Sequence, residues 1–339
     1  MDWRYFFYIN ISQIFLILSS MKPIDLQETI LNPPAHSNYK IIILTSNNFR
    51  HKRFAYRVQK AFPNLVVAWY EIRNDVKTRY IDKEKNKLKH KKFRFLKIKK
   101  IIIFLLKIIF TIIKNPKMIN EVFKQAKWYL IRRTYSKNSI QIEEKTFGYE
   151  LKLIKKYSVV EKQKINSMDI NTDDFSEILK KYNAYFLITL GGPMLKNKII
   201  KSVKGLALNQ HAGHSPEYKG SKTIEWALYN RDLRYLSNTV HLTTTAADGG
   251  PILRRSNICI HPNDKPQKIF LKSVALGTEL MIESISDIID NENILVFNQP
   301  KIPGRTYLGK EFTDDILASI VHDFKLKWLK NALKRQKNW

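Results

Sequence analysis

The chain has little cysteine, few acidic residues and no glycine-rich motif in its first predicted loop. A single cysteine, Cys259, among 339 residues excludes an intramolecular disulfide and a thiolate metal cluster. Its place in the apolar run 258–260 predicts a buried, unreactive thiol. The polar turn at 45–49 holds neither G-x-G-x-x-G nor a Walker lysine motif, so dinucleotide and P-loop sites are not predicted there.

Acidic residues are outnumbered, with 30 Asp and Glu against 59 Lys and Arg, which gives a net charge of +29. Such an excess is typical of proteins that bind nucleic acid or anionic membranes. Abundant Ile, Asn and Lys are also what an AT-rich genome encodes, which weakens that inference. The charge is densest over 83–117, where a basic run precedes an apolar run (101–113) too short to span a bilayer, which needs about 20 residues. Two interpretations stay open: an interfacial helix on an anionic membrane, or a buried helix whose lysines reach outward.

The N-terminal segment is apolar over 5–18 but makes a poor signal peptide, since Asp2 and Arg4 precede it and no convincing cleavage site follows. Met21 is a more ordinary start. We therefore assign 1–35 to a leader, either an over-extended reading frame or an apolar anchor. We expect a cytoplasmic protein, peripheral to the inner membrane face if 83–117 binds lipid.

Continuous apolar runs that end in turns predict buried parallel strands, and their alternation with helices predicts an α/β fold with a doubly wound, Rossmann-like sheet. The predicted strands cover 41–44, 65–69, 184–190 and 240–242. Helices are predicted over 50–61, 223–229, 268–289 and 314–333. The resulting domains are a catalytic domain (36–262) with a mostly helical basic insertion (74–146), and a C-terminal helical extension (263–339).

An amide, an imidazole and a carboxylate lie at two predicted strand-to-loop junctions. Asn209 and His211 end an apolar run and are followed at once by turn residues, and Asp248 opens the turn Asp-Gly-Gly-Pro. Folds of the α/β class usually place their chemistry at such junctions. No metal site is predicted, because His211 and His214 lie three residues apart on a loop without a clear third ligand.

These motifs resemble the formyltransferase family, which includes glycinamide ribonucleotide, methionyl-tRNA and sugar N-formyltransferases. The Asn-x-His at 209–211, Pro216 five residues after that histidine, and the later Asp-x-Gly-Pro match in order. Trp226 and His241 lie between them. The resemblance covers residues 39–72 and 180–262, and 142–148 resembles a linker of the members that act in polysaccharide pathways. It implies 10-formyltetrahydrofolate as the cofactor and enzymatic formyl transfer as the activity.

The resemblance also implies a role for each site residue. Asn209 would hydrogen-bond the formyl oxygen, His211 would stand beside the reacting carbon, and Asp248 would tune the imidazole and assist proton transfer. An oxyanion donor and a group that titrates near neutrality are what attack by an amine requires. The implied walls of the pteridine pocket are Gly191, Gly192, Met194, Leu195, Thr244, Thr245, Ala246 and Ala247. Candidate substrate contacts are His214, Tyr218, Lys219 and Gly220, whereas Trp226 and His241 fit core packing, with support of the site a second option for His241.

Three interpretations of the acceptor stay open. The first is a nucleotide-linked amino sugar of lipopolysaccharide or capsule synthesis, favoured by the 211–216 loop and the 142–148 segment. The second is methionyl-tRNA, which the basic charge would suit through phosphate contacts; the helical C-terminal region is unlike the β-rich second domain of the tRNA enzymes. The third is a catalytically silent, membrane-associated binding protein. A homodimer is expected by family analogy.

Overall fold

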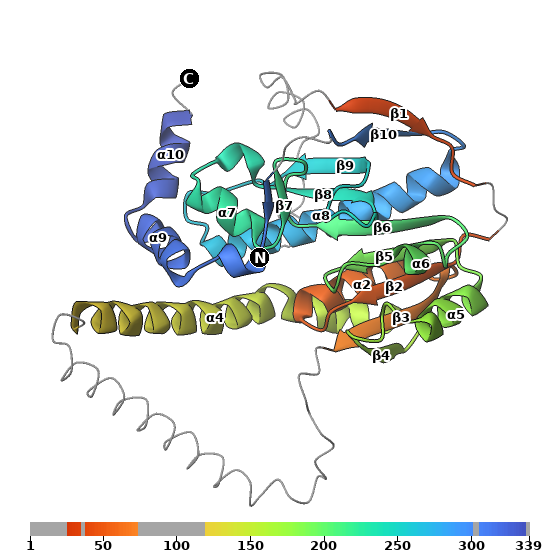
Figure 1. The fold of residues 1–339 in the computed structure, drawn as a ribbon, viewed down its shortest axis with the longest axis horizontal. Coiled ribbons are helices and arrows are strands. Elements are labelled where there is room, and N and C mark those ends of the chain that lie inside the picture. The colour runs from red at the N-terminus through yellow and green to blue at the C-terminus, as the bar shows by residue number, and fades with distance from the viewer. Residues whose placement is uncertain (1–25, 35–37, 74–118, 301–304, 337–339) are drawn as a thin grey trace, which may run out of the picture.

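The computed structural model describes residues 26–34, 38–73, 119–300 and 305–336, and Figure 1 shows the fold. The strands are β1 (Gln27–Leu31), β2 (Ile41–Thr45), β3 (Val66–Arg73), β4 (Lys162–Asn166), β5 (Phe186–Leu190), β6 (Leu206–His211), β7 (Tyr218–Gly220), β8 (Ser237–Leu242), β9 (Ile252–Asn257), β10 (Ile294–Asn298) and β11 (Arg305–Tyr307). The α-helices are α2 (Phe49–Ala61), α4 (Ile119–Ile154), α5 (Asp173–Tyr182), α6 (Asn197–Ile200), α7 (Thr223–Tyr229), α8 (Pro266–Asp290), α9 (Asp314–Lys325) and α10 (Trp328–Gln336).

The central sheet has nine strands in the order β1-β10-β9-β8-β6-β5-β2-β3-β4. The five strands from β6 to β4 run parallel, and the pairs from β6/β8 to β10/β1 are antiparallel. The α/β class predicted from the sequence is therefore confirmed, and its parallel half is Rossmann-like. The sheet is mixed because β8 turns back beside β6 instead of crossing over in parallel.

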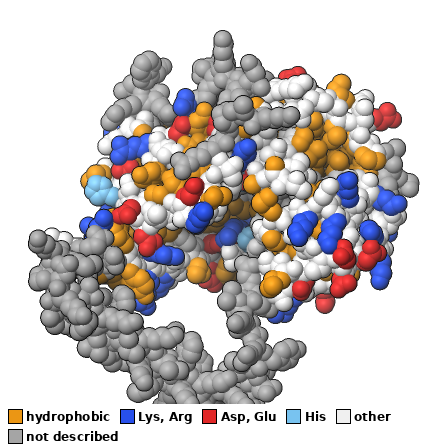
Figure 2. Space-filling model, viewed as in Figure 1, with side chains coloured by type: hydrophobic (Ala, Val, Ile, Leu, Met, Phe, Trp, Pro, Cys, Tyr) orange, Lys and Arg blue, Asp and Glu red, His pale blue; other side chains and the backbone are white. Residues whose placement is uncertain are grey.

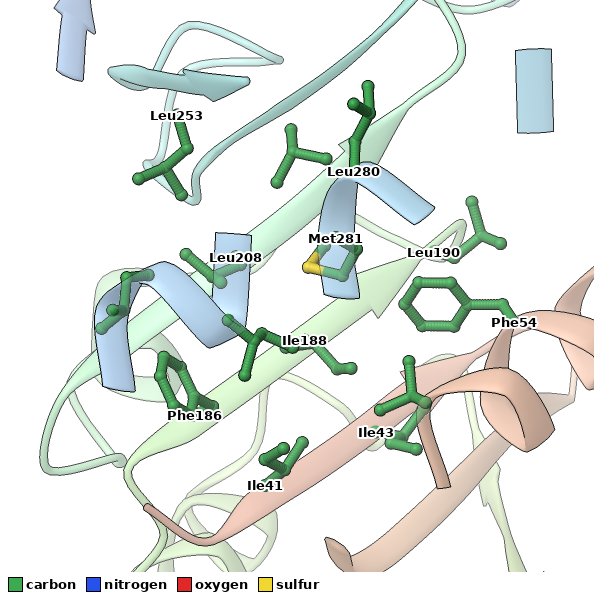
Figure 3. Packing of buried hydrophobic residues seen from close by; sticks show 14 of the residues in the cluster. Ile41, Ile43, Phe54, Phe186, Ile188, Leu190, Leu208, Leu253, Leu280 and Met281 are labelled. Carbon is green, nitrogen blue, oxygen red and sulfur yellow. The ribbon is translucent and has the colours of Figure 1, made fainter. Parts of the chain in front are cut away.

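Helices cover both faces of the parallel half, as doubly wound folds require. Successive residues of β2 point to opposite faces, so that Ile41 and Ile43 pack under α2 and α8, and Ile42 and Leu44 pack under α5 and α6. Figure 3 shows Ile41 and Ile43 on the first face, with Phe54 of α2 and Met281 of α8. Full burial of such a side chain stabilises the fold by about 1.5–3 kcal/mol.

The sheet extends beyond the 36–262 catalytic domain predicted from the sequence. Strand β1 comes from the predicted leader and pairs antiparallel with β10, which comes from the predicted C-terminal extension. Helix α8 packs on β8 and β9, so this extension contributes to the main core. The predicted helix over 314–333 is two helices, α9 and α10, separated at Lys327, whose φ is +57°. Together with α7 they enclose a third hydrophobic cluster that contains Trp226.

Residues 142–148 lie inside the long helix α4, and their interpretation as a linker was wrong. The reason is their spacing: Glu143, Phe147 and Ile154 are buried at intervals of four and seven residues, which places them on one face of a helix. This face packs against α2 (Figure 1), where Arg50 and Arg53 pair with acidic side chains of α4. The basic insertion is therefore helical from Ile119 onward.

Several predictions fall on parts of the chain that the structure does not describe. The proposed membrane segment (83–117) and residues 1–20 lie outside the described residues. Within the described part, no helix is long and apolar enough to cross a bilayer. The prediction of a buried Cys259 was wrong: its side chain is exposed, since the chain has left β9 and Ile258 takes the inward position. On the face in Figure 2, lysine and arginine side chains are interspersed with acidic ones.

Candidate active site

A row of three polar side chains crosses the middle of the sheet. In the strand register, Asn209 of β6 lies beside Thr189 of β5 and opposite His241 of β8. Neighbours in register point to the same face of a sheet, so their side chains meet. The Thr189 hydroxyl donates to Asn209 Oδ1 at 2.7 Å, and Asn209 Nδ2 lies 3.1 Å from His241 Nε2. The Asn209 amide is thereby oriented with its oxygen toward β5 and its N–H groups toward β8.

His211 follows Asn209 by two residues on β6 and therefore points to the same face. Its Nε2 lies 2.8 Å from the Tyr218 carbonyl oxygen, and its Nδ1 lies 3.2 Å from Asp248 Oδ2. Both neighbours are acceptors, so a protonated ring can donate to both. Gly213 is required here, because a Cβ at this position would lie 2.2 Å from His211 Nε2.

Asp248 reaches the row from the loop between β8 and β9. Its Oδ1 accepts from Asn209 Nδ2 at 3.3 Å, and its Oδ2 accepts from the Gly220 N–H at 2.8 Å. Burial by itself raises the carboxyl pKa, but the facing His211 and His241 and the Gly220 amide outweigh it. The pKa of Asp248 therefore lies well below its ordinary value. Asp248 is a carboxylate across the neutral range.

These side chains line a cavity of about 680 Å³. It is lined by the turn after β5, the loop after β8, the first turn of α2, parts of α4, α7 and α8, and residues 306–309. Asn209, His211, His241 and Asp248 all lie on its wall. A cavity of this size suits organic ligands of moderate size. The predicted catalytic trio is thus brought together in one pocket.

Comparison with known proteins identifies the family. The sequence matches the family described as "Formyl transferase" over residues 106–285. The chain belongs to the formyl transferase family. It is 33% identical over 163 residues to a methionyl-tRNA formyltransferase of Thermodesulfovibrio yellowstonii, which covers 48% of this chain and 49% of that protein. A methionyl-tRNA formyltransferase of Clostridium tetani is 24% identical over 164 residues, with 48% of this chain and 51% of that protein covered. The chain spans about half the length of these curated relatives.

Solved structures give a weaker comparison. A sugar N-formyltransferase from Shewanella aligns over 80% of this chain and 78% of its own, with 10% identity and a TM-score of 0.46. A 4-N formyltransferase from Francisella tularensis aligns over 80% and 78%, with 12% identity and a TM-score of 0.45.

The cavity is lined by most of the cofactor-binding residues proposed from the sequence. Seven of the eight line the cavity, namely Gly191, Gly192, Met194, Leu195, Thr244, Ala246 and Ala247. Thr245 does not line it. Gly191 and Gly192 have φ values of +70° and +115°, which a turn leaving β5 can adopt because neither residue has a Cβ.

Only one of the four proposed substrate contacts lines the cavity. Gly220 lines the cavity, but His214, Tyr218 and Lys219 do not. His214 packs against Tyr235 and hydrogen-bonds the Ser237 hydroxyl through Nδ1 at 3.0 Å. The ring of Tyr218 stacks on Tyr307, with 5.3 Å between centroids, and only its carbonyl reaches His211. The side chains of His214 and Tyr218 therefore pack outside the cavity and hold the loop after β6 in position. Among the described residues no cluster of His, Cys, Asp and Glu is placed to hold a metal ion.

The sequence interpretation missed several residues of the site. Thr189 was part of a predicted strand without a role, although it is a hydroxyl residue near the end of an apolar run. Gln299 donates to the carbonyls of Asp248 and Gly250 at 2.8 and 2.7 Å, and so fixes the loop that carries the carboxylate. No local pattern marks Gln299. The cavity walls from Arg50, His51 and α4 were also missed, since they depend on how α4 packs.

We predict that Thr189→Val lowers formyl-transfer kcat about tenfold. The substitution keeps the shape of the side chain but removes the hydroxyl that holds Asn209 Oδ1, and misorientation of an amide that acts in catalysis, as the sequence predicts for Asn209, is costly. Steady-state kinetics would measure this effect. Thr189→Ser, which keeps the hydroxyl, should retain most of the activity; equal loss in both variants would contradict a positioning role.

We also predict that the protein loses stability as the pH falls below about 6.5, the ordinary pKa of histidine. Burial, with the nearby Arg255, lowers the pKa of His214 to about 2, so the unfolded chain takes up a proton that the folded chain does not. Unfolding is then favoured by up to about 1.4 kcal/mol per pH unit below that value. Urea unfolding at pH 7 and pH 5 would measure it. His214→Gln should reduce the dependence, with a part remaining from the buried His51, whose pKa is also lowered, and the same change at the exposed His322 should leave it unchanged.

Proposed function

We propose that this protein transfers the formyl group of 10-formyltetrahydrofolate to the amine of a nucleotide-linked amino sugar, in surface polysaccharide biosynthesis. The observation that carries formyl transfer is the convergence of Asn209, His211 and Asp248 on one cavity wall. In the reaction the amine nitrogen bonds to the formyl carbon as the bond from that carbon to the folate nitrogen breaks. The amine proton leaves, and the folate nitrogen gains one.

Each member of the trio has a task in that sequence. We assign the Asn209 Nδ2 amide as the donor to the negative charge that develops on the formyl oxygen; without substrate its N–H groups face His241 Nε2 and Asp248 Oδ1 and would have to turn to the formyl oxygen. In this proposal the pair of His211 and the Asp248 carboxylate accepts and returns the amine proton. Thr189 and Gln299 hold the amide and the Asp248 loop in position.

The end of the cavity near β5 fits a folate. It is formed by Leu44, Leu190 and Leu195, and by the backbone of the turns 191–195 and 243–248. Apolar side chains beside exposed peptide groups suit a flat heterocycle that is both aromatic and rich in hydrogen-bonding atoms. The folate supplies the activated one-carbon unit when bound.

The other end of the cavity supports a small polar acceptor. Tyr135, Ser139 and Glu143 of α4 line it together with Glu225 of α7. Glu225 is only 6% exposed and Glu143 only 7%. Carboxylates and hydroxyls recognise sugar hydroxyls and amines well.

Methionyl-tRNA is the second candidate acceptor. Two observations favour it: the sequence similarity to methionyl-tRNA formyltransferases, and the net charge of +29. The assembled trio makes a catalytically silent scaffold the least favoured alternative.

The test is formyl transfer from 10-formyltetrahydrofolate to a panel of nucleotide-linked 3-amino and 4-amino sugars, with charged initiator methionyl-tRNA as a parallel acceptor. We expect turnover with one sugar and none with tRNA. Turnover with tRNA alone would replace the proposed acceptor. Absence of turnover with every acceptor, from protein that binds the folate, would favour the silent scaffold.

A further inference from the structure

One buried donor, where the acceptor end of the cavity meets the turn after β5, is not used by the proposed reaction. His51, in the first turn of α2, is 4% exposed and lines the cavity. Its Nδ1 accepts the Asn48 N–H at 3.2 Å, which places the ring proton on Nε2. Among the described residues no hydrogen-bond partner of Nε2 is found. Burial and the neighbouring Arg50 lower the pKa of His51, so the ring is neutral.

The Nε2 atom lies beside the turn after β5. A Cβ built on Gly191 would be 3.0 Å from His51 Nε2, so the lack of a side chain there lets the imidazole approach the turn. His51 therefore presents a single neutral N–H donor between the α2 terminus and that turn.

The anion-binding groups next to His51 are already occupied by the protein itself. The first turn of a helix offers free N–H groups to an anion, and arginine binds carboxylate or phosphate through paired N–H groups. Here the Arg50 N–H donates to Glu143 Oε1 at 2.8 Å, and Arg50 Nη1 donates to Glu143 Oε2 at 2.7 Å. Glu143 comes from α4, 93 residues along the chain. The inserted helix thus places its own carboxylate where a phosphate would bind α2.

We infer that Glu143 closes the anion site at the N-terminus of α2, and that His51 Nε2–H, at the junction of the folate and acceptor ends, donates to an uncharged oxygen of the acceptor, a hydroxyl or an amide carbonyl. The assignment of that oxygen to the acceptor rests on the proposed function. The closure of the anion site by Glu143 does not.

The charges around the cavity support this assignment. A phosphate entering here would meet two buried carboxylates, Glu143 and Glu225, and would find the Arg50 charge already paired. Lys222 lies 3.5 Å from Glu225, and its side chain is half exposed. An anion without a free partner is poorly tolerated in a buried site, whereas a hydroxyl needs only one donor or acceptor. In this assignment His51 selects the acceptor by its hydrogen bond, and the negative charge of Glu143 disfavours an anion next to it.

The closure is tested first by binding of inorganic phosphate, without any enzymatic assay. Titration calorimetry and the phosphate dependence of the melting temperature would be measured for the wild type, Glu143→Gln and Glu144→Gln. Glu144 is the matched control, since it is exposed on the same helix. Glu143→Gln removes the charge but keeps an acceptor for Arg50, and circular dichroism would verify that it folds.

We expect Glu143→Gln to bind phosphate at least about tenfold more tightly than the other two proteins, as loss of a buried like charge implies. Equal phosphate binding by wild type and Glu143→Gln would overturn the closure. A comparison of the wild type with Arg50→Gln also tests it. Saturable binding of phosphate at millimolar concentration by the wild type, abolished in Arg50→Gln, would show that the site is open.

The donor is tested with His51→Asn and His51→Gln. Asparagine keeps an acceptor near the Asn48 N–H but withdraws the far donor, whereas glutamine extends an N–H toward the position of Nε2. We expect His51→Asn to raise the KM of the acceptor about tenfold with kcat changed less than threefold, the scale of one lost hydrogen bond, and His51→Gln to restore most of it. Unchanged KM in both variants would overturn the role of His51. If the wild type transfers no formyl group to any acceptor, the proposed function fails, while the phosphate titration still decides the closure.

Discussion

Asp248→Ala is expected to abolish formyl transfer, by about a thousandfold or more, in a protein that still folds. The carboxylate contacts the Asn209 amide and the Gly220 N–H and faces both His211 and His241, so its loss disorganises all the groups that handle charge. Proton transfer by a positioned group alone contributes about 10²–10⁴-fold. His211→Ala should have a similar effect. The measurement is kcat/KM with the acceptor identified in the panel, alongside circular dichroism.

Asp248→Asn separates charge from shape. The amide oxygen can still accept the Gly220 N–H, but it carries no charge to stabilise a protonated His211, so we expect activity nearly as low as in the alanine variant. Because the pKa of Asp248 is lowered, the group stays ionised above about pH 4, the ordinary value for aspartate, and any fall in activity between pH 5 and 7 must arise elsewhere. The exposed Asp174 gives a control, Asp174→Asn. Near-normal transfer by Asp248→Asn would end the assignment.

Asn209→Ala is expected to lower kcat by about a hundredfold to a thousandfold, the usual cost of one lost oxyanion donor. The effect should fall on kcat more than on the KM of the folate, because the amide is needed when charge develops on the formyl oxygen.

The strand itself supplies a control for Asn209. Gln210 is the next residue, and its amide points to the opposite face of β6, where Nε2 donates to the Val274 carbonyl of α8 at 2.9 Å. Gln210 also lines the cavity, but its amide is held by α8, so Gln210→Ala should lower the free energy of unfolding and change kcat far less than Asn209→Ala does. Comparable kcat losses in the two variants would indicate a general disturbance of β6 and would argue against an oxyanion donor.

The parts of the site that follow from local pattern were predictable from the sequence. The alternation of a strand puts Asn209 and His211 on one face, and the turn that begins with Asp248 follows the next strand closely. Long, continuous apolar runs such as that of β5 identify buried parallel strands whatever surrounds them. The resemblance then gave these positions their chemical roles.

The parts that depend on pairing between distant segments were not predictable. The functions of Thr189 and His241 come from the register of three strands, which no single segment specifies. Glu143 was placed in a linker because its contact, Arg50, lies on α2 and the apolar spacing of α4 is interrupted by many exposed apolar residues. Cys259 was misjudged because an apolar run of three residues does not reveal which of them points inward.

The pairing of β1 with β10 has a consequence for how the protein folds during synthesis. Gln27 pairs with Asn298, so β1 is synthesised long before the strand with which it pairs. Contacts between segments so far apart in sequence are slow to form, since the intervening loop must first be closed. The parallel half, with the trio on β6 and the loop after β8, can assemble first. Until β10 arrives, the outer edge of β9 lacks the partner it has in the finished sheet, and unpaired edges of this kind are where nascent chains associate wrongly.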